Sequence, residues 1–205
     1  ASREKHCQWL IAMVPTIQWA EYILDKTGEE ALNELWEILL KLCYITEDND
    51  VVKTWEEKGR RNAERGRAVD ALKLTKLHYT ASNGTDLTVG LTPWSKFGHE
   101  DSDLPAGQVP FNANIPSEEI FTTPDKFGTN GIVYASRPLL LGGKSIENFG
   151  FRFEKGKVVE VLADEGKEML EALINTDENA GYLGEAALVE YHSPISMSGL
   201  VYYTT

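Results

Sequence analysis

The chain is poor in cysteine and histidine and lacks any long apolar run. Each of these shortages excludes some classes of protein. Its two cysteines, Cys7 and Cys43, form no metal-binding motif. No secretory signal of the usual composition precedes the first expected helix, so we expect a reducing, cytoplasmic location. The four histidines are scattered, without a pair at helical spacing, and none by itself predicts a metal site. No membrane partner is expected, because no apolar run is long enough to span a bilayer.

Basic residues are also scarce, since 20 Lys and Arg stand against 32 Asp and Glu, for a formal net charge of -12. This balance argues against a nucleic-acid partner, because such binding relies on Lys and Arg to neutralise phosphates. A basic cluster within residues 56–67 is interspersed with glutamates, which is typical of a solvated helix face. With 42% hydrophobic and 25% charged residues, the composition is that of an ordinary globular protein.

The sequence changes character near residue 76, where we place a boundary. Residues 1–76 carry long helical patterns with many charges, whereas residues 77–205 carry short runs rich in Val, Thr, Tyr and Phe between Gly and Asn turns. Successive short strands with few helices favour antiparallel pairing over an alternating parallel fold. We therefore expect an α+β fold, with a helical N-terminal part followed by a mainly antiparallel β-rich domain that contains one or two helices.

Local signals predict the main elements. A capping box, Thr27-Gly-Glu-Glu30, predicts the start of one helix, and a second helix is expected over residues 50–74. Asn83-Gly84 predicts the tight turn of a hairpin, because this pair readily adopts positive φ angles. The polar loop over residues 92–111 is long enough to suggest a substrate cleft. The remaining expected elements are a helix over 165–174 and strands over 77–80, 86–91, 131–136, 149–153, 158–163, 186–189 and 200–204.

Three carboxylates are the best candidates for chemistry. Glu118 and Glu119 are adjacent at the mouth of a short apolar run, and Glu185 precedes small apolar residues that are typical of a buried strand. Adjacent like charges are costly unless a cation compensates them, so the pattern favours a divalent-cation site with carboxylate ligands. If the segment is extended, Glu118 and Glu119 face opposite ways and cannot be equivalent ligands without a bulge. From the residues alone, the ligand could be either of the two.

Six phrases of the sequence resemble the aminopeptidase T family of two-metal exopeptidases, whose bacterial members include aminopeptidase S. Two contain the candidate glutamates, Asn112-Ala-Asn-Ile-Pro-Ser-Glu-Glu-Ile-Phe-Thr-Thr-Pro124 and Tyr182-Leu-Gly-Glu-Ala-Ala-Leu-Val189. The other four lie within residues 83–91, 136–144, 176–185 and 199–204. The resemblance is strongest from residue 77 onward and continues more weakly through the helical part.

The resemblance implies a metal-dependent aminopeptidase that removes N-terminal residues from unblocked peptides through a metal-bridging hydroxide. It implies two divalent ions, zinc or cobalt, with manganese as an alternative. Glu119 and Glu185 are then metal ligands, with Glu185 between the two ions, and Glu118 is a general base by analogy with other dinuclear peptidases. Residues 1–76 would end a preceding domain, and residues 77–205 would belong to the metallopeptidase catalytic domain. Members of the family are habitually homodimers.

Only the two glutamates match the family's ligand set, whose histidines, tyrosine and aspartate come nearer the C-terminus. We therefore expect these 205 residues to be an internal piece of a longer enzyme, inactive alone and weak in metal binding. Two other readings stay open. One is a noncatalytic binding or scaffold module in which Glu118 and Glu119 form a solvated turn and Glu185 caps a strand. The other is a glycosidase, which also needs two facing carboxylates.

Overall fold

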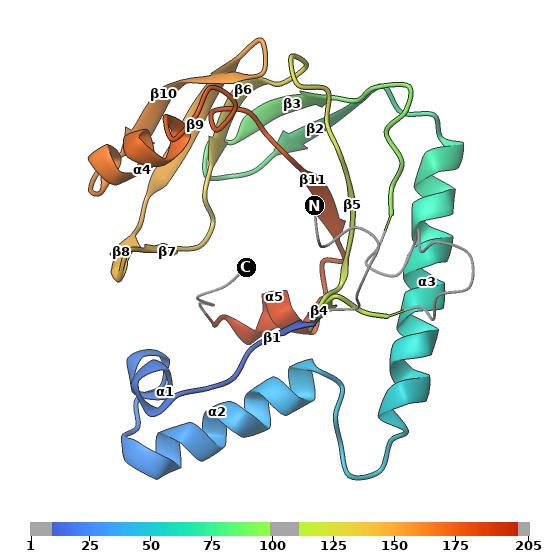
Figure 1. Cartoon of the computed structure of the whole chain (residues 1–205), viewed down its shortest axis with the longest axis vertical. Coiled ribbons are helices and arrows are strands. Elements are labelled where there is room, and N and C mark those ends of the chain that lie inside the picture. The colour runs from blue at the N-terminus through green and yellow to red at the C-terminus, as the bar shows by residue number, and fades with distance from the viewer. Residues whose placement is uncertain (1–9, 99–110, 201–205) are drawn as a thin grey trace.

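The computed structural model describes residues 10–98 and 111–200, and this part of the chain is α+β, as predicted (Figure 1). After one short strand come three helices, and the β-rich part that follows carries two short helices. Of the loop expected over 92–111, residues 99–110 lie outside the described ranges, as does the strand expected over 200–204 apart from Leu200. The helices are α1 (Ile17–Ile23), α2 (Gly28–Leu42), α3 (Val51–Ala71), α4 (Lys167–Ile174) and α5 (Pro194–Ser198).

Helix α2 begins where the sequence predicts, but without the capping box. Thr27 is the N-cap residue and its side chain makes no capping hydrogen bond. Glu30 instead pairs with Lys26, at 2.7 Å between the carboxylate and Nζ, so its carboxylate is already occupied. The acidic first turn still suits the positive end of the helix dipole. One apolar face of α2, including Leu35 and Leu39, then packs against Trp19 of α1.

Helix α3 has a side-chain cap, because the Asp50 carboxylate accepts a hydrogen bond from the Lys53 backbone N–H at 3.1 Å. We expect Asp50→Ala to lower the free energy of unfolding by about 1 kcal/mol, since one N–H at the helix start loses its partner. Urea denaturation measures the change. Asp48→Ala, in the exposed turn just before, is the matched control and should have little effect. Equal losses in the two variants would contradict the capping role.

The largest sheet has the strand order β10-β9-β6-β3-β2, and all of its neighbours are antiparallel. The hairpin predicted around Asn83-Gly84 is present, with Thr80 opposite Asp86 at its end. The strands are β1 (Ile11–Ala12), β2 (Lys76–Thr80), β3 (Asp86–Gly90), β4 (Asn114–Ile115), β5 (Glu119–Thr122), β6 (Asn130–Tyr134), β7 (Leu139–Leu141), β8 (Lys144–Ile146), β9 (Phe149–Glu154), β10 (Lys157–Ala163) and β11 (Ala186–Val189).

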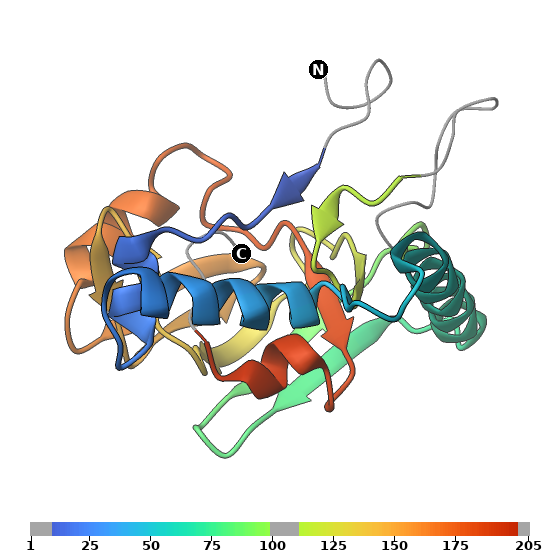
Figure 2. The same cartoon turned by 90° about the horizontal axis from the view of Figure 1, so that it is seen from below.

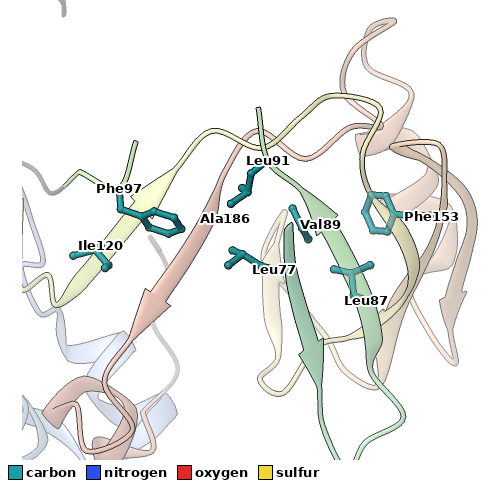
Figure 3. Close-up of a cluster of buried hydrophobic side chains, with 8 residues drawn as sticks. All are labelled: Leu77, Leu87, Val89, Leu91, Phe97, Ile120, Phe153 and Ala186. Carbon is teal, nitrogen blue, oxygen red and sulfur yellow. The ribbon is translucent and has the colours of Figure 1, made fainter. Parts of the chain in front are cut away.

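Three pairs of short strands lie outside this sheet: β1–β4, β5–β11 and β7–β8. The antiparallel pair β5–β11, which we call the ladder, joins the two phrases of the sequence that contain the candidate glutamates. One buried cluster binds the ladder to the large sheet (Figure 3). Its members are Leu77, Leu87, Val89, Leu91, Phe97, Ile120, Phe153 and Ala186.

Contacts also cross the boundary predicted near residue 76. Strand β1 precedes the helices in the chain, yet it pairs in parallel with β4, which follows them. Helix α3 packs against β5, and Leu200 packs against the buried cluster of α1 and α2. Figure 2 shows α3 nearly end-on beside the ladder. Helices α2 and α5 lie across the side of the molecule that faces the viewer. The division into residues 1–76 and 77–205 therefore stays a prediction about domains.

Candidate functional site

The ladder has a buried face and an open face, because side chains alternate along its strands. Ile120, Thr122 and Ala186 are buried, at 1%, 2% and 7% exposure. Glu119 points the other way and lies opposite Val189, which is half-exposed. The open face therefore carries Glu119 at one end of the ladder.

Glu185 belongs to the same face. It directly precedes β11 and lies four residues from Val189, an even step that returns to the same side of the strand. A rise of about 3.3 Å per residue separates Glu185 from Glu119 by about 13 Å along the strands. Both carboxylates line one open groove of about 690 Å³. The structure thus places two acids that are 66 positions apart in the sequence along one groove, about 13 Å from each other.

The rest of the groove is largely apolar. Strands β1 and β4 form one wall, and the segment from β11 to α5 forms another. Val189 and Tyr191 expose 50% and 84% of their surface there. Apolar residues in the lining are Ile11, Ala12, Met13, Ile115, Pro116, Val189, Tyr191 and Ile195.

Glu118 directly precedes β5 and lines the same groove as Glu119, but it is mostly buried. It is 8% exposed, and its carboxylate accepts hydrogen bonds from the Tyr44 and Ser193 hydroxyls. Lys58 of α3 donates to the same carboxylate from 3.3 Å. The Lys58 ammonium also lies 3.8 Å from the centre of the Tyr44 ring, a favourable cation–π contact.

These contacts determine the protonation state of Glu118. Burial by itself raises the pKa of this carboxyl, but the hydrogen bonds from Ser193 and Tyr44 and the charge of Lys58 outweigh burial, so the pKa lies below its ordinary value. Burial and the nearby Glu118 charge raise the pKa of the Tyr44 hydroxyl, which therefore stays protonated and donates. An ionised carboxylate with a lowered pKa and three donors is a weak base, so this environment does not favour the general-base role expected for Glu118.

Helix α3 holds both strands of the ladder. The Arg65 guanidinium donates to the Glu118 carbonyl oxygen at 3.3 Å and lies 3.7 Å from the Glu190 carboxylate. Arg61 pairs with the same carboxylate at 3.0 Å. The basic cluster of α3 is thus only partly the solvated face that the sequence predicts. Arg60, paired with Glu57 and Glu64 at the surface, does fit that prediction.

The groove contains donor groups of the kind that divalent metal ions prefer. Carboxylate oxygens suit hard divalent ions and are also accepted by zinc and cobalt. Glu119 and Glu185 supply such oxygens within one groove, so they fit a metal centre in donor type. Among residues 10–98 and 111–200, however, no three or more His, Cys, Asp or Glu side chains come together as a metal-binding group. The described part of the chain therefore offers two ligands of a centre that needs more.

The described helices include none that is both long and apolar enough to cross a membrane.

Comparisons with known proteins agree in pointing to one family. A family model described as "Thermophilic metalloprotease (M29)" matches residues 1–205. Aminopeptidase AmpS of Bacillus subtilis is 38% identical over 198 residues, which are 96% of this chain and 48% of that protein. Aminopeptidase T of Thermus thermophilus is 37% identical over 198 residues, again 96% of this chain and 48% of that protein.

A solved structure also matches. The chain superimposes on wild-type AmpT from Thermus thermophilus with a TM-score of 0.81 and 37% identity. The match covers 92% of this chain and 46% of that one, so the chain spans about half the length of the relatives it matches. A match over the whole of this sequence, supported by relatives of the same kind, decides the family. The chain belongs to the thermophilic metalloprotease family M29.

Proposed function

We propose that the full-length protein containing this chain is a metal-dependent aminopeptidase, which removes N-terminal residues from peptides with a free α-amine. The observation that carries the proposal is the shared groove of Glu119 and Glu185, on one face of the ladder, in a chain of family M29. The relatives named above, each described as an aminopeptidase, support the substrate class.

In this proposal Glu119 and Glu185 hold divalent metal, with Glu185 between two ions of zinc or cobalt, or of manganese as the alternative. Such ions, when bound, polarise a scissile carbonyl and lower the pKa of water. The carboxylates of the chain neutralise the ions, and any net negative charge left in the groove attracts the ammonium group of a peptide. Further ligands are needed to complete the centre, because the described residues supply only these two.

The apolar lining of the groove has a role of its own. Met13, Val189 and Ile195 offer an apolar wall that can receive the side chain of the residue to be removed. Contact with this wall displaces water from the groove and stabilises a bound apolar side chain. We therefore expect peptides that begin with an apolar residue to be accepted.

Three further parts of the proposal rest on the sequence. Residues 1–76 are the end of a preceding domain, and residues 77–205 belong to the catalytic domain. The protein is a homodimer, by its resemblance to the family. Its location is the cytoplasm, because a chain with only two cysteines lacks the set of disulfide bonds that is typical of proteins in oxidising compartments.

The test compares a free peptide with its N-acetylated form, using the full-length protein with cobalt or zinc. We expect the free peptide to be hydrolysed at least about a hundredfold faster, because acetylation removes the charge that the groove recognises. Activity should disappear with a chelator and return with added metal. Equal cleavage of the two peptides, or cleavage that survives chelation, would reject the proposal. No hydrolysis of any peptide would favour a binding or scaffold module.

A further inference from the structure

We propose that Glu118 is a positioning residue, whose buried carboxylate joins three other segments to the start of β5 and thereby holds Glu119 toward the groove. The inference rests on the proposed function, because it concerns the role of Glu119 as a metal ligand. It assigns a task to Tyr44, Lys58, Arg65 and Ser193 as well.

The donors to the Glu118 carboxylate come from three different segments of the chain. Tyr44 follows the end of α2, Lys58 lies in α3, and Ser193 is the N-cap residue of α5. They lie 74, 60 and 75 positions from Glu118 in the sequence. One carboxylate therefore connects three separate segments to β5. Hydrogen bonds to a buried charge are the stronger kind, and losing one partner leaves the others poorly compensated.

The contacts of Glu118 also restrain Glu119. Glu118 directly precedes β5 and Glu119 is its first residue, so fixing the Glu118 side chain restrains the backbone from which Glu119 extends. Arg65 adds a direct restraint, because it donates to the carbonyl oxygen of the peptide unit that links the two residues, at 3.3 Å. The backbone at Glu119 is therefore held in place by α3.

Residues after the partner strand β11 belong to the same set of contacts. Glu190 directly follows β11, and it pairs with Arg61 and Arg65 of α3 at 3.0 and 3.7 Å. Ser193, three residues further on, donates to Glu118 and accepts from the Ser196 backbone N–H at the start of α5. The network around Glu118 therefore holds the end of β11 against the beginning of β5, which is the end of the ladder that carries Glu119.

The hydrogen bonds of Glu118 argue against a direct role in the reaction. One Glu118 carboxylate oxygen accepts from Tyr44 and Lys58, and the other accepts from Ser193. Glu118 also lines the groove, but both of its carboxylate oxygens are engaged and only 8% of the residue is exposed, so little of the carboxylate is available to a bound peptide. Removing a group that orients a metal ligand typically lowers metal affinity or activity by about 10- to 100-fold.

The experiment uses Tyr44→Phe and Ser193→Ala in the full-length protein, with Glu119→Gln as the reference. Cobalt affinity of the metal-free protein is measured by competition with a chelator, and the visible spectrum of bound cobalt reports the ligand geometry. We expect each of the two positioning variants to bind cobalt about tenfold more weakly, with an altered spectrum. We also expect kcat on a free peptide to fall more than KM rises. Arg60→Ala, on the exposed side of α3, is the control and should change neither affinity nor spectrum.

The outcomes separate the inference from the proposed function. If Glu119→Gln weakens cobalt binding while Tyr44→Phe and Ser193→Ala do not, the positioning role is wrong and the metal role stands. If Glu118→Gln keeps normal cobalt affinity and loses kcat about a thousandfold, Glu118 acts on the substrate and the inference is again wrong. If Glu119→Gln itself leaves cobalt binding unchanged, the proposed function fails. Lys58→Met, at a side chain that is 22% exposed, supplies the test if Tyr44→Phe does not fold.

Discussion

Glu119→Gln and Glu185→Gln should each lower kcat/KM for a free peptide by at least about a thousandfold, equivalent to about 4 kcal/mol of lost transition-state stabilisation. The amide keeps the shape of each side chain but removes the negative charge that a divalent ion requires. Both residues lie on the open face of the ladder, so neither change disturbs the buried core. The melting temperature of the metal-free protein should therefore change by only a few degrees.

Steady-state kinetics and the metal content of the purified full-length protein measure this effect. Glu178→Gln is the matched control, because Glu178 is exposed, lies seven residues before Glu185 and does not line the groove. It should keep its activity within about twofold, as expected of a surface substitution. Normal activity in either of the other two variants would remove that residue from the metal centre. Loss of activity with full metal content would point to a role in substrate binding instead.

Much of the fold could be predicted from local sequence, because the signals that specify it are local. Asn83-Gly84 predicts a hairpin, and the hairpin is there with the expected strands beside it. The helix expected over 50–74 is α3, and the one over 165–174 is α4. In each case, neighbouring residues supply the turn conformation, the cap or the apolar spacing. The prediction of a capping box at Thr27 was wrong, since the Glu30 carboxylate pairs with Lys26 and the Thr27 side chain makes no capping hydrogen bond.

The candidate site could be predicted only in part. Glu119 and Glu185 are marked by their own surroundings, as acids beside apolar strands, and the ladder brings them to one face. No local sequence signal predicts the hydrogen-bond partners of Glu118. Tyr44 resembles any tyrosine after a helix, and Ser193 resembles any helix cap. Their contact with Glu118 depends on tertiary packing over 74 and 75 positions, which no local pattern encodes.

The buried face of the ladder supports a prediction about stability. Ile120 is 1% exposed, and it packs in the cluster that joins the ladder to the large sheet (Figure 3). We expect Ile120→Ala to cost about 3 kcal/mol, because it removes buried methyl groups and leaves a cavity that the surrounding strands fill only in part. For a protein of the relatives' length, about twice that of this chain, the melting temperature should fall by about 3 to 6 °C.

Thermal unfolding of the full-length protein measures that fall, and Val159→Ala is the control. Val159 is also a strand residue, but it is 47% exposed, so its loss should cost less than about 0.5 kcal/mol. Because Ile120 faces away from the groove, Ile120→Ala should keep most of its cobalt affinity well below its melting temperature. A stable variant that has lost metal would mean that the core behind the ladder, and not the Glu118 network, controls the direction of Glu119.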